Sequence, residues 1–157
     1  MTSTGSNPCS VPSTAADIMR TPVVTVSSTA SLRELLNLLR RTGVSGVPVV
    51  GMDQKVIGTV SVTDLMWCSD RLAAEDADVD DSARAVRHLD ETTVREVMTP
   101  DVFGVGPQAS LAEVAAFFAS TGLGRAVVLD SGELVGIVSV VDLLALFADR
   151  TSDAGAG

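Results

Sequence analysis

The order of apolar and polar residues predicts one series of short elements that occurs twice along the chain. Between residues 32 and 39, leucines recur at the three- and four-residue spacing of an amphipathic helix. Two short apolar runs follow at 47–50 and 56–60, separated by a turn, which is the pattern of a β-hairpin. With a short opening helix and a closing helix, each series is predicted to run helix, strand, helix, strand, strand, helix.

The two series are copies of one unit. An offset of 79 residues places Thr14 on Thr93, and the same offset aligns both opening helices and both amphipathic helices. A one-residue deletion in the hairpin turn then changes the offset to 78, which places Asp64 on Asp142. Self-similarity at a fixed period indicates that one structural unit is duplicated.

Each predicted helix begins with a capping box, in which a hydroxyl residue is followed three residues later by an acid. Such a pair satisfies free backbone N–H groups at the start of a helix. Two glycines, Gly43 and Gly122, suit the left-handed position just after the amphipathic helices. The six boxes are Thr14 with Asp17, Ser31 with Glu34, Ser61 with Asp64, Thr93 with Glu96, Ser110 with Glu113, and Ser139 with Asp142.

Composition adds constraints on the core and on partners. Hydrophobic residues make up 46% of the 157 residues but aromatic residues only 3%, so the core must be aliphatic. This excess of aliphatic surface indicates helices buried on two sides, most simply in a homodimer. The net charge of −9 disfavours nucleic acid and anionic membrane surfaces as partners.

The series also predict where the domains lie. The expected parts are a disordered tail at 1–12, the first motif at 13–69, an acidic linker at 70–91, the second motif at 92–150 and a disordered tail at 151–157. We expect at most a helical turn in the linker, and His88 as a surface residue. No secretion signal opens the sequence and no apolar run could span a bilayer, so we expect a cytoplasmic protein.

Both halves resemble the cystathionine-β-synthase (CBS) domain family. The resemblance is carried in the first half by Asp17–Pro22, Gly43–Val50 and Val56–Leu65, and in the second half by Val97–Pro100, Gly122–Leu129 and Leu134–Leu143. It implies an α/β fold of the α+β type, a tandem CBS-domain pair of two βαββα-type units related by a pseudo-twofold axis, with two clefts. In the family these clefts often hold AMP, ADP, ATP or S-adenosylmethionine, and members regulate an enzyme, a channel or a transporter.

The acids of the closing helices are the candidate ribose ligands. A carboxylate in a first helical turn, as expected for Asp64 and Asp142, can accept both hydrogens of a ribose diol. The free N–H groups and the helix dipole beside Ser61 and Ser139 favour a phosphate. From the residues alone, both boxes could equally do no more than cap their helices. The resemblance favours ribose binding in at least one cleft.

The remaining candidate contacts are to the base and the phosphate. An apolar base pocket is expected from Val24, Thr25, Val26, Val47, Pro48, Phe103, Gly104, Val105, Ala126 and Val127. Most of these residues are in any case expected to be core residues of the strands. The resemblance implies a phosphate contact at Arg125, whose counterpart in the first half is Gly46. Because fixed cations are few, a ligand with one phosphate or none fits best.

Three classes of function compete. The favoured one is a regulatory sensor of an adenosine-containing ligand, with no required cofactor and with a homodimer as its assembly. A ligand-free dimerisation or scaffold module is the alternative. The sequence shows no Cys–His pair, no metal-ligand cluster and no Walker-type glycine loop, so we expect that the protein is not an enzyme.

Overall fold

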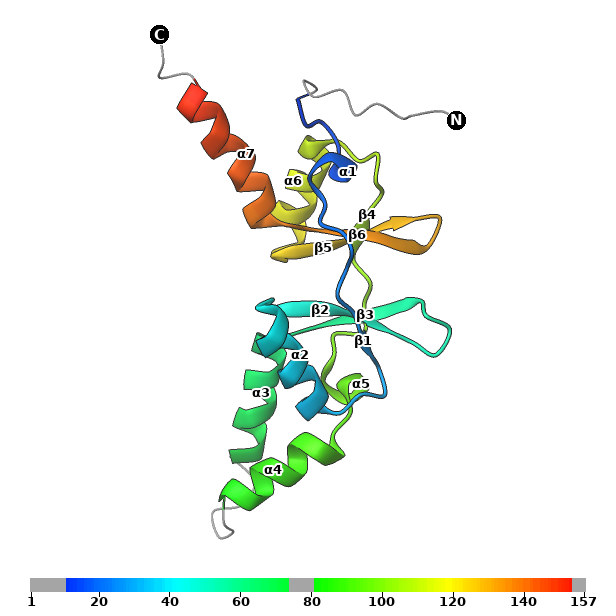
Figure 1. The fold of residues 1–157 in the computed structure, drawn as a ribbon, viewed down its shortest axis with the longest axis vertical. Helices are drawn as coiled ribbons and strands as arrows, with labels where there is room; N and C mark the ends of the chain where they lie inside the picture. Colours follow the sequence, from blue (N-terminus) through cyan, green and yellow to red (C-terminus); the bar gives the residue numbers. More distant parts are fainter. Residues whose placement is uncertain (1–10, 74–80, 154–157) are drawn as a thin grey trace. The chain divides into compact units, whose positions relative to one another are not determined.

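The computed structural model describes residues 11–73 and 81–153 (Figure 1). In these residues the elements follow in the order α1 (Ala15–Ile18), β1 (Val26–Ser27), α2 (Leu32–Thr42), β2 (Gly46–Val50), β3 (Val56–Ser61), α3 (Val62–Ala73), α4 (Asp81–Glu91), α5 (Val94–Val97), β4 (Gly104–Val105), α6 (Leu111–Thr121), β5 (Arg125–Asp130), β6 (Glu133–Ser139) and α7 (Val140–Asp153). The predicted element order and mixed α/β class are confirmed in both repeats.

Each repeat supplies one three-stranded sheet. The first has the order β1-β2-β3, in which β1 is parallel to β2 and β2 is antiparallel to β3. The second has the equivalent order β4-β5-β6, with β4 parallel to β5. The edge strands β1 and β4 have only two residues each. The chain divides into two compact units, each built around one sheet, which we call the first-sheet unit and the second-sheet unit.

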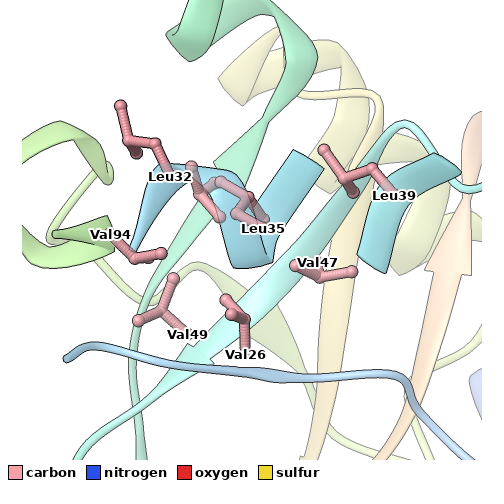
Figure 2. Packing of buried hydrophobic residues seen from close by; sticks show 8 residues of the cluster. Val26, Leu32, Leu35, Leu39, Val47, Val49 and Val94 are labelled. Carbon is pink, nitrogen blue, oxygen red and sulfur yellow. The ribbon is translucent and has the colours of Figure 1, made fainter. Parts of the chain in front are cut away.

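The core of the first-sheet unit lies between α2 and its sheet. Leu35 of α2 and Val49 of β2 are fully buried, and Figure 2 shows the α2 leucines above the strand valines. The buried cluster consists of Val26, Leu32, Leu35, Leu39, Val47, Val49, Val60 and Val94. Burial of one such aliphatic side chain contributes about 1.5–3 kcal/mol, so an aliphatic core of this size holds the unit together without aromatic residues.

The second-sheet unit has an equivalent core under α6. Its buried cluster consists of Ala15, Val114, Phe118, Ala126, Val128, Val138 and Leu143. Phe117 and Phe118 meet edge to face, with ring centroids 5.7 Å apart. The cluster includes Ala15 of α1, a residue of the first repeat.

The opening helices are exchanged between the repeats. Helix α1 belongs to the second-sheet unit, where the Ala15 amide donates to the Ala109 carbonyl at 2.8 Å. Helix α5 belongs to the first-sheet unit, where the Val94 amide donates to the Ala30 carbonyl at 2.8 Å. Each compact unit therefore combines the opening helix of one repeat with the sheet and closing helix of the other.

The helix ends follow the predicted local chemistry. The Ser31 amide donates to a Glu34 carboxylate oxygen at 2.7 Å, and the Glu34 amide donates to the Ser31 hydroxyl at 3.2 Å. The glycines that end α2 and α6 are left-handed, with φ of 71° at Gly43 and 69° at Gly122. These caps fix where α2 and α6 begin and end.

The segment that we expected to be a linker contains more structure than predicted. Helix α4 has eleven residues and packs against α2, where Leu89 is partly buried against the core. Arg33 of α2 forms a salt bridge with Asp90 of α4. At the other end of the chain, α7 continues to Asp153, three residues into the predicted tail. Residues 1–10, 74–80 and 154–157 of the predicted tails and linker lie outside the described residues.

Candidate functional site

The carboxylate of Asp64 is held at the start of α3. One oxygen, Oδ2, accepts the Ser61 amide at 2.7 Å and the Ser61 hydroxyl at 2.9 Å. Within the part of the chain that the structure describes, the second oxygen, Oδ1, accepts no hydrogen bond. The capping role that we predicted is confirmed, and it leaves one oriented acceptor on a half-buried carboxylate.

The carboxylate of Asp142 makes the same two contacts with its serine at the start of α7. Its second oxygen differs from that of Asp64 because it has a partner within the chain. Its Oδ2 accepts the Ser139 amide at 2.9 Å and the Ser139 hydroxyl at 2.7 Å. Its Oδ1 accepts a hydrogen bond from Nε of Arg20 at 2.7 Å, and Nη2 of the same guanidinium lies 2.7 Å from this oxygen. The Asp142 side chain is only 9% exposed, whereas that of Arg20 is 72% exposed. Both oxygens of this carboxylate are therefore occupied within the chain.

The ion pair also sets the charge state of Asp142. Burial opposes ionisation of its carboxyl, but hydrogen bonds from Ser139 and Arg20 outweigh burial and lower its pKa below the ordinary value. The carboxyl is therefore ionised at neutral pH, as both the salt bridge and the cap require.

Backbone pairing places Arg20 beside Asp142. The Arg20 amide donates to the Ile137 carbonyl at 2.8 Å, and the Ile137 amide donates back at 3.2 Å. The segment after α1 thus lies along β6, next to the strand end that leads into Asp142. Close approach depends on Gly136, because a Cβ there would lie 2.9 Å from the Cβ of Met19.

The first-sheet unit has the same backbone pairing, but Thr99 stands at the position of Arg20. The Thr59 amide donates to the Thr99 carbonyl at 3.0 Å, and the Thr99 amide donates to the Thr59 carbonyl at 2.9 Å. Gly58 permits the approach there, because a Cβ at this position would overlap the Thr99 carbonyl oxygen. Thr99 therefore occupies the position of Arg20 but carries no cation.

Sequence reasoning missed Arg20 as a site residue. The available signal was the difference between Met-Arg-Thr-Pro at residues 19–22 and Met-Thr-Pro at residues 98–100. Its meaning depends on the exchange of opening helices, which brings the segment after α1 to β6.

The expected base-pocket residues occupy mixed environments. Val26, Val47, Pro48, Ala126 and Val127 are buried, and all but Pro48 and Val127 belong to the two core clusters. Val24, Thr25 and Val105 are half-buried, whereas Phe103 and Gly104 are exposed. The buried members fill strand interiors, so only their backbone groups are suited to read a base.

Arg125, the predicted phosphate contact, begins β5. Its side chain is half-buried and already interacts with another group of the chain. Its role toward a phosphate stays a prediction.

A Cys–His pair that the sequence did not reveal lies where α4 packs. The Sγ of Cys68 is 3.3 Å from Nε2 of His88, and Nδ1 of His88 is 3.0 Å from the Thr92 hydroxyl. His88 is half-buried, which is less exposed than we expected for a surface residue of a linker. The pair lines a hollow of about 220 Å³ whose lining residues are Leu32, Leu36, Val62, Leu65, Met66, Cys68, His88 and Leu89.

Two negative findings apply to the described residues alone. They contain no group of three or more His, Cys, Asp or Glu side chains that could hold a metal ion. Among the same residues, no helix has the length and apolar character needed to cross a membrane.

Together these features define a tandem-repeat α/β protein in which each closing helix carries a capped Ser–Asp box. The CBS domain family matches the chain over residues 15–69 and 94–149, and the chain belongs to this family. The resemblance seen in the sequence motifs is confirmed.

Two curated relatives illustrate the range of contexts. The chain is 30% identical over 132 residues to the CBS domain-containing protein YhcV of Bacillus subtilis, covering 83% of each protein. It is 30% identical over 122 residues to inosine-5′-monophosphate dehydrogenase of Korarchaeum cryptofilum, covering 77% of this chain. The match spans only 21% of that enzyme's length.

Solved structures with the same fold include two ligand complexes. CBSX2 in complex with AMP has a TM-score of 0.69 at 23% identity, covering 88% of this chain and 98% of CBSX2. The CBS domain pair of MJ0100, in complex with 5′-methylthioadenosine and S-adenosylmethionine, has a TM-score of 0.69 at 22% identity. That match covers 87% of this chain and 97% of the MJ0100 chain.

Proposed function

We propose that this protein is a regulatory sensor that binds an adenosine-containing ligand through the capped aspartates of its closing helices. The observation that carries the proposal is the Asp64 carboxylate, which is half-buried and oriented by Ser61, with Oδ1 left as an acceptor. Support comes from the ligands of two proteins of the same fold, AMP in CBSX2 and two adenosine derivatives in MJ0100.

The cap prepares Asp64 for a diol. Because Ser61 holds Oδ2 through two hydrogen bonds, the carboxylate does not have to reorganise when a ligand arrives. Ribose 2′- and 3′-hydroxyls can then donate to Oδ1, and hydrogen bonds to a charged acceptor are the stronger kind. The first-turn N–H groups of α3 and its positive dipole end favour a phosphate nearby.

The base and phosphate contacts follow from the remaining candidate residues. Adenine contacts backbone groups of the segment Val24–Val26, which leads into β1, or of β4 at Val105. Arg125 supplies a cation for a phosphate. The side chains of these strands exclude water from the base, which strengthens each polar contact.

Calorimetry tests the proposal with AMP, adenosine and 2′,3′-dideoxy-AMP, which lacks the diol. The unmodified protein should bind AMP at least about 10-fold more tightly than the dideoxy compound, the affinity ratio that corresponds to about 1.4 kcal/mol. Asp64→Ala should lose this diol dependence at its site. The matched control is Glu113→Ala, which removes a capping acid of α6 and should leave ligand binding intact.

A ligand-free dimerisation module is the second candidate, and exposed apolar side chains favour it. On α3 these are Val62, Met66 and Trp67, and on α7 they are Val141, Leu144 and Phe147. Large apolar side chains gathered on one helix usually mark a surface that another molecule covers. We propose a homodimer for either function. If the unmodified protein binds no adenosine compound, the dimerisation module alone remains.

A further inference from the structure

The two capped aspartates differ in one respect that bears on ligand choice. The Oδ1 of Asp142 accepts a hydrogen bond from the Arg20 guanidinium, whereas within the described residues the Oδ1 of Asp64 accepts none. Since the diol in the proposed function needs this oxygen, a ligand must displace at least one Arg20 N–H group before it can bind Asp142. The same step is not needed at Asp64.

We propose that Arg20 is a specificity-determining residue, which makes the Asp142 site select adenosine ligands that carry a phosphate over uncharged nucleosides. This inference rests on the proposed function and names the ligand class of one of its two sites. The Asp64 site, which has Thr99 at the position of Arg20, discriminates between nucleotide and nucleoside less strongly.

The burial of the two partners decides which one moves. The Asp142 side chain is 9% exposed and fixed by Ser139, but the Arg20 side chain is 72% exposed. The only side-chain partner of Arg20 among the described residues is Asp142. The arginine therefore swings away while the aspartate stays, because no other contact of the guanidinium has to break.

A phosphate compensates the displaced guanidinium. Arginine presents a planar fork of donors that matches phosphate oxygens in a bidentate manner. When the ribose diol of a nucleotide donates to Oδ1 of Asp142, the phosphate of the same ligand gives Arg20 a new anionic partner. A nucleoside binds the same oxygen but has no phosphate to replace it as the partner of Arg20. A cationic ligand such as a sulfonium adds repulsion, so it should bind this site least well.

The expected size of the effect is moderate. Charge-assisted hydrogen bonds contribute more than neutral ones, but the exposure of Arg20 weakens its pair through screening. We expect AMP to bind the Asp142 site about 5- to 50-fold more tightly than adenosine, against about 3-fold or less at the Asp64 site.

The two repeats supply the matched variants. Arg20→Thr gives the Asp142 site the residue found at Thr99, and Thr99→Arg makes the reverse exchange. Each site is isolated by Asp64→Ala or Asp142→Ala, and calorimetry measures AMP and adenosine on every variant. Arg20→Lys keeps the charge but loses the fork, so it should retain part of the preference. Thermal melting verifies that each variant is folded.

The outcomes separate the two proposals. In the Asp64→Ala background, Arg20→Thr should tighten adenosine binding and reduce the AMP preference at the Asp142 site to about 3-fold or less. In the Asp142→Ala background, Thr99→Arg should create a preference for AMP at the Asp64 site. If adenosine compounds bind but the preference at Asp142 survives Arg20→Thr, or is lost only in Arg125→Ala, the role of Arg20 is refuted and the sensor function stands. If no adenosine compound binds the unmodified protein or the Arg20→Thr variant, both proposals are refuted.

Discussion

The guanidinium of Arg20 holds Oδ1 of Asp142 at 2.7 Å through both Nε and Nη2. The equivalent position in the other repeat is Thr99, which pairs its backbone with Thr59 in the same way but brings no charge to Asp64. Duplication has thus kept the backbone arrangement and changed the electrostatics. A ligand that binds through these aspartates would therefore find a cation beside Asp142 and none at the equivalent position near Asp64.

The ion pair has a consequence for stability against pH. The pKa of Asp142 is lowered in the folded state from its ordinary 3.8, so its contribution to stability is present above pH 3.8 and is lost as pH falls through the folded value. The free energy of unfolding should therefore differ between the unmodified protein and Asp142→Asn by a constant amount at pH 5–7, and the difference should shrink below about pH 4. Urea unfolding across this range measures it. A difference that grows on acidification would contradict the assignment.

The pKa itself should respond to Arg20. Removing the guanidinium in Arg20→Thr takes away one cause that lowers the pKa of Asp142 and leaves burial, which raises it. We expect the Asp142 carboxyl to titrate at higher pH in Arg20→Thr, as followed by carbon NMR of the side chain. Asp17, whose carboxylate is held by Ser13 and Thr14, is the internal control and should not move.

The exchanged segments require glycine where they cross the strands. A Cβ at Gly58 would overlap the Thr99 carbonyl oxygen and lie 3.3 Å from the Pro100 Cα, both backbone atoms that cannot turn aside. Gly58→Ala should therefore lower the free energy of unfolding by about 1–3 kcal/mol. Gly106→Ala is the control, since nothing lies within 4 Å of its added Cβ. Equal stability of the two variants in urea would show that the crossing is looser than described.

Local chemistry and non-local packing were predictable to different degrees. The capping box of Ser31 and Glu34 and the left-handed Gly43 were predicted because a few neighbouring residues determine them. Helix α4 was underestimated because its sequence is acidic and polar, and only packing against α2 makes Leu89 partly buried against the core. Tertiary contacts of this kind override local propensity.

The candidate site also combines local features, which could be predicted, with non-local contacts, which could not. Ser61 and Asp64 form a box that spacing alone reveals. The pairing of Arg20 with Asp142 joins residues 122 positions apart, and the Cys68–His88 contact depends on how α4 packs. Neither could be seen in the sequence, because each requires knowing which segment lies beside which strand or helix.

The core offers a matched pair of neighbours on α2. Leu35 is fully buried against Val49, whereas Leu36, one residue later, is 38% exposed. Leu35→Ala should destabilise by about 2–5 kcal/mol, because removal of a buried leucine costs its transfer energy and leaves a cavity. Leu36→Ala removes the same atoms from a partly exposed side chain and should cost less than about 1.5 kcal/mol. Similar losses in the two variants would show that the helix is rotated from its described position.

The exposed apolar side chains of the closing helices lead us to predict self-association. Trp67 is 69% exposed on α3, beside exposed Met66, and an indole of this size is seldom left in water without a partner. Light scattering at micromolar concentration should report about 32 kDa, twice the chain mass of 16.2 kDa. Trp67→Asp places a charge in the shared surface and should shift the protein to monomer. Val86→Asp is the control, because it adds the same charge at an exposed apolar residue of α4. A monomeric unmodified protein, or a dimer indifferent to Trp67→Asp, would contradict this role for α3.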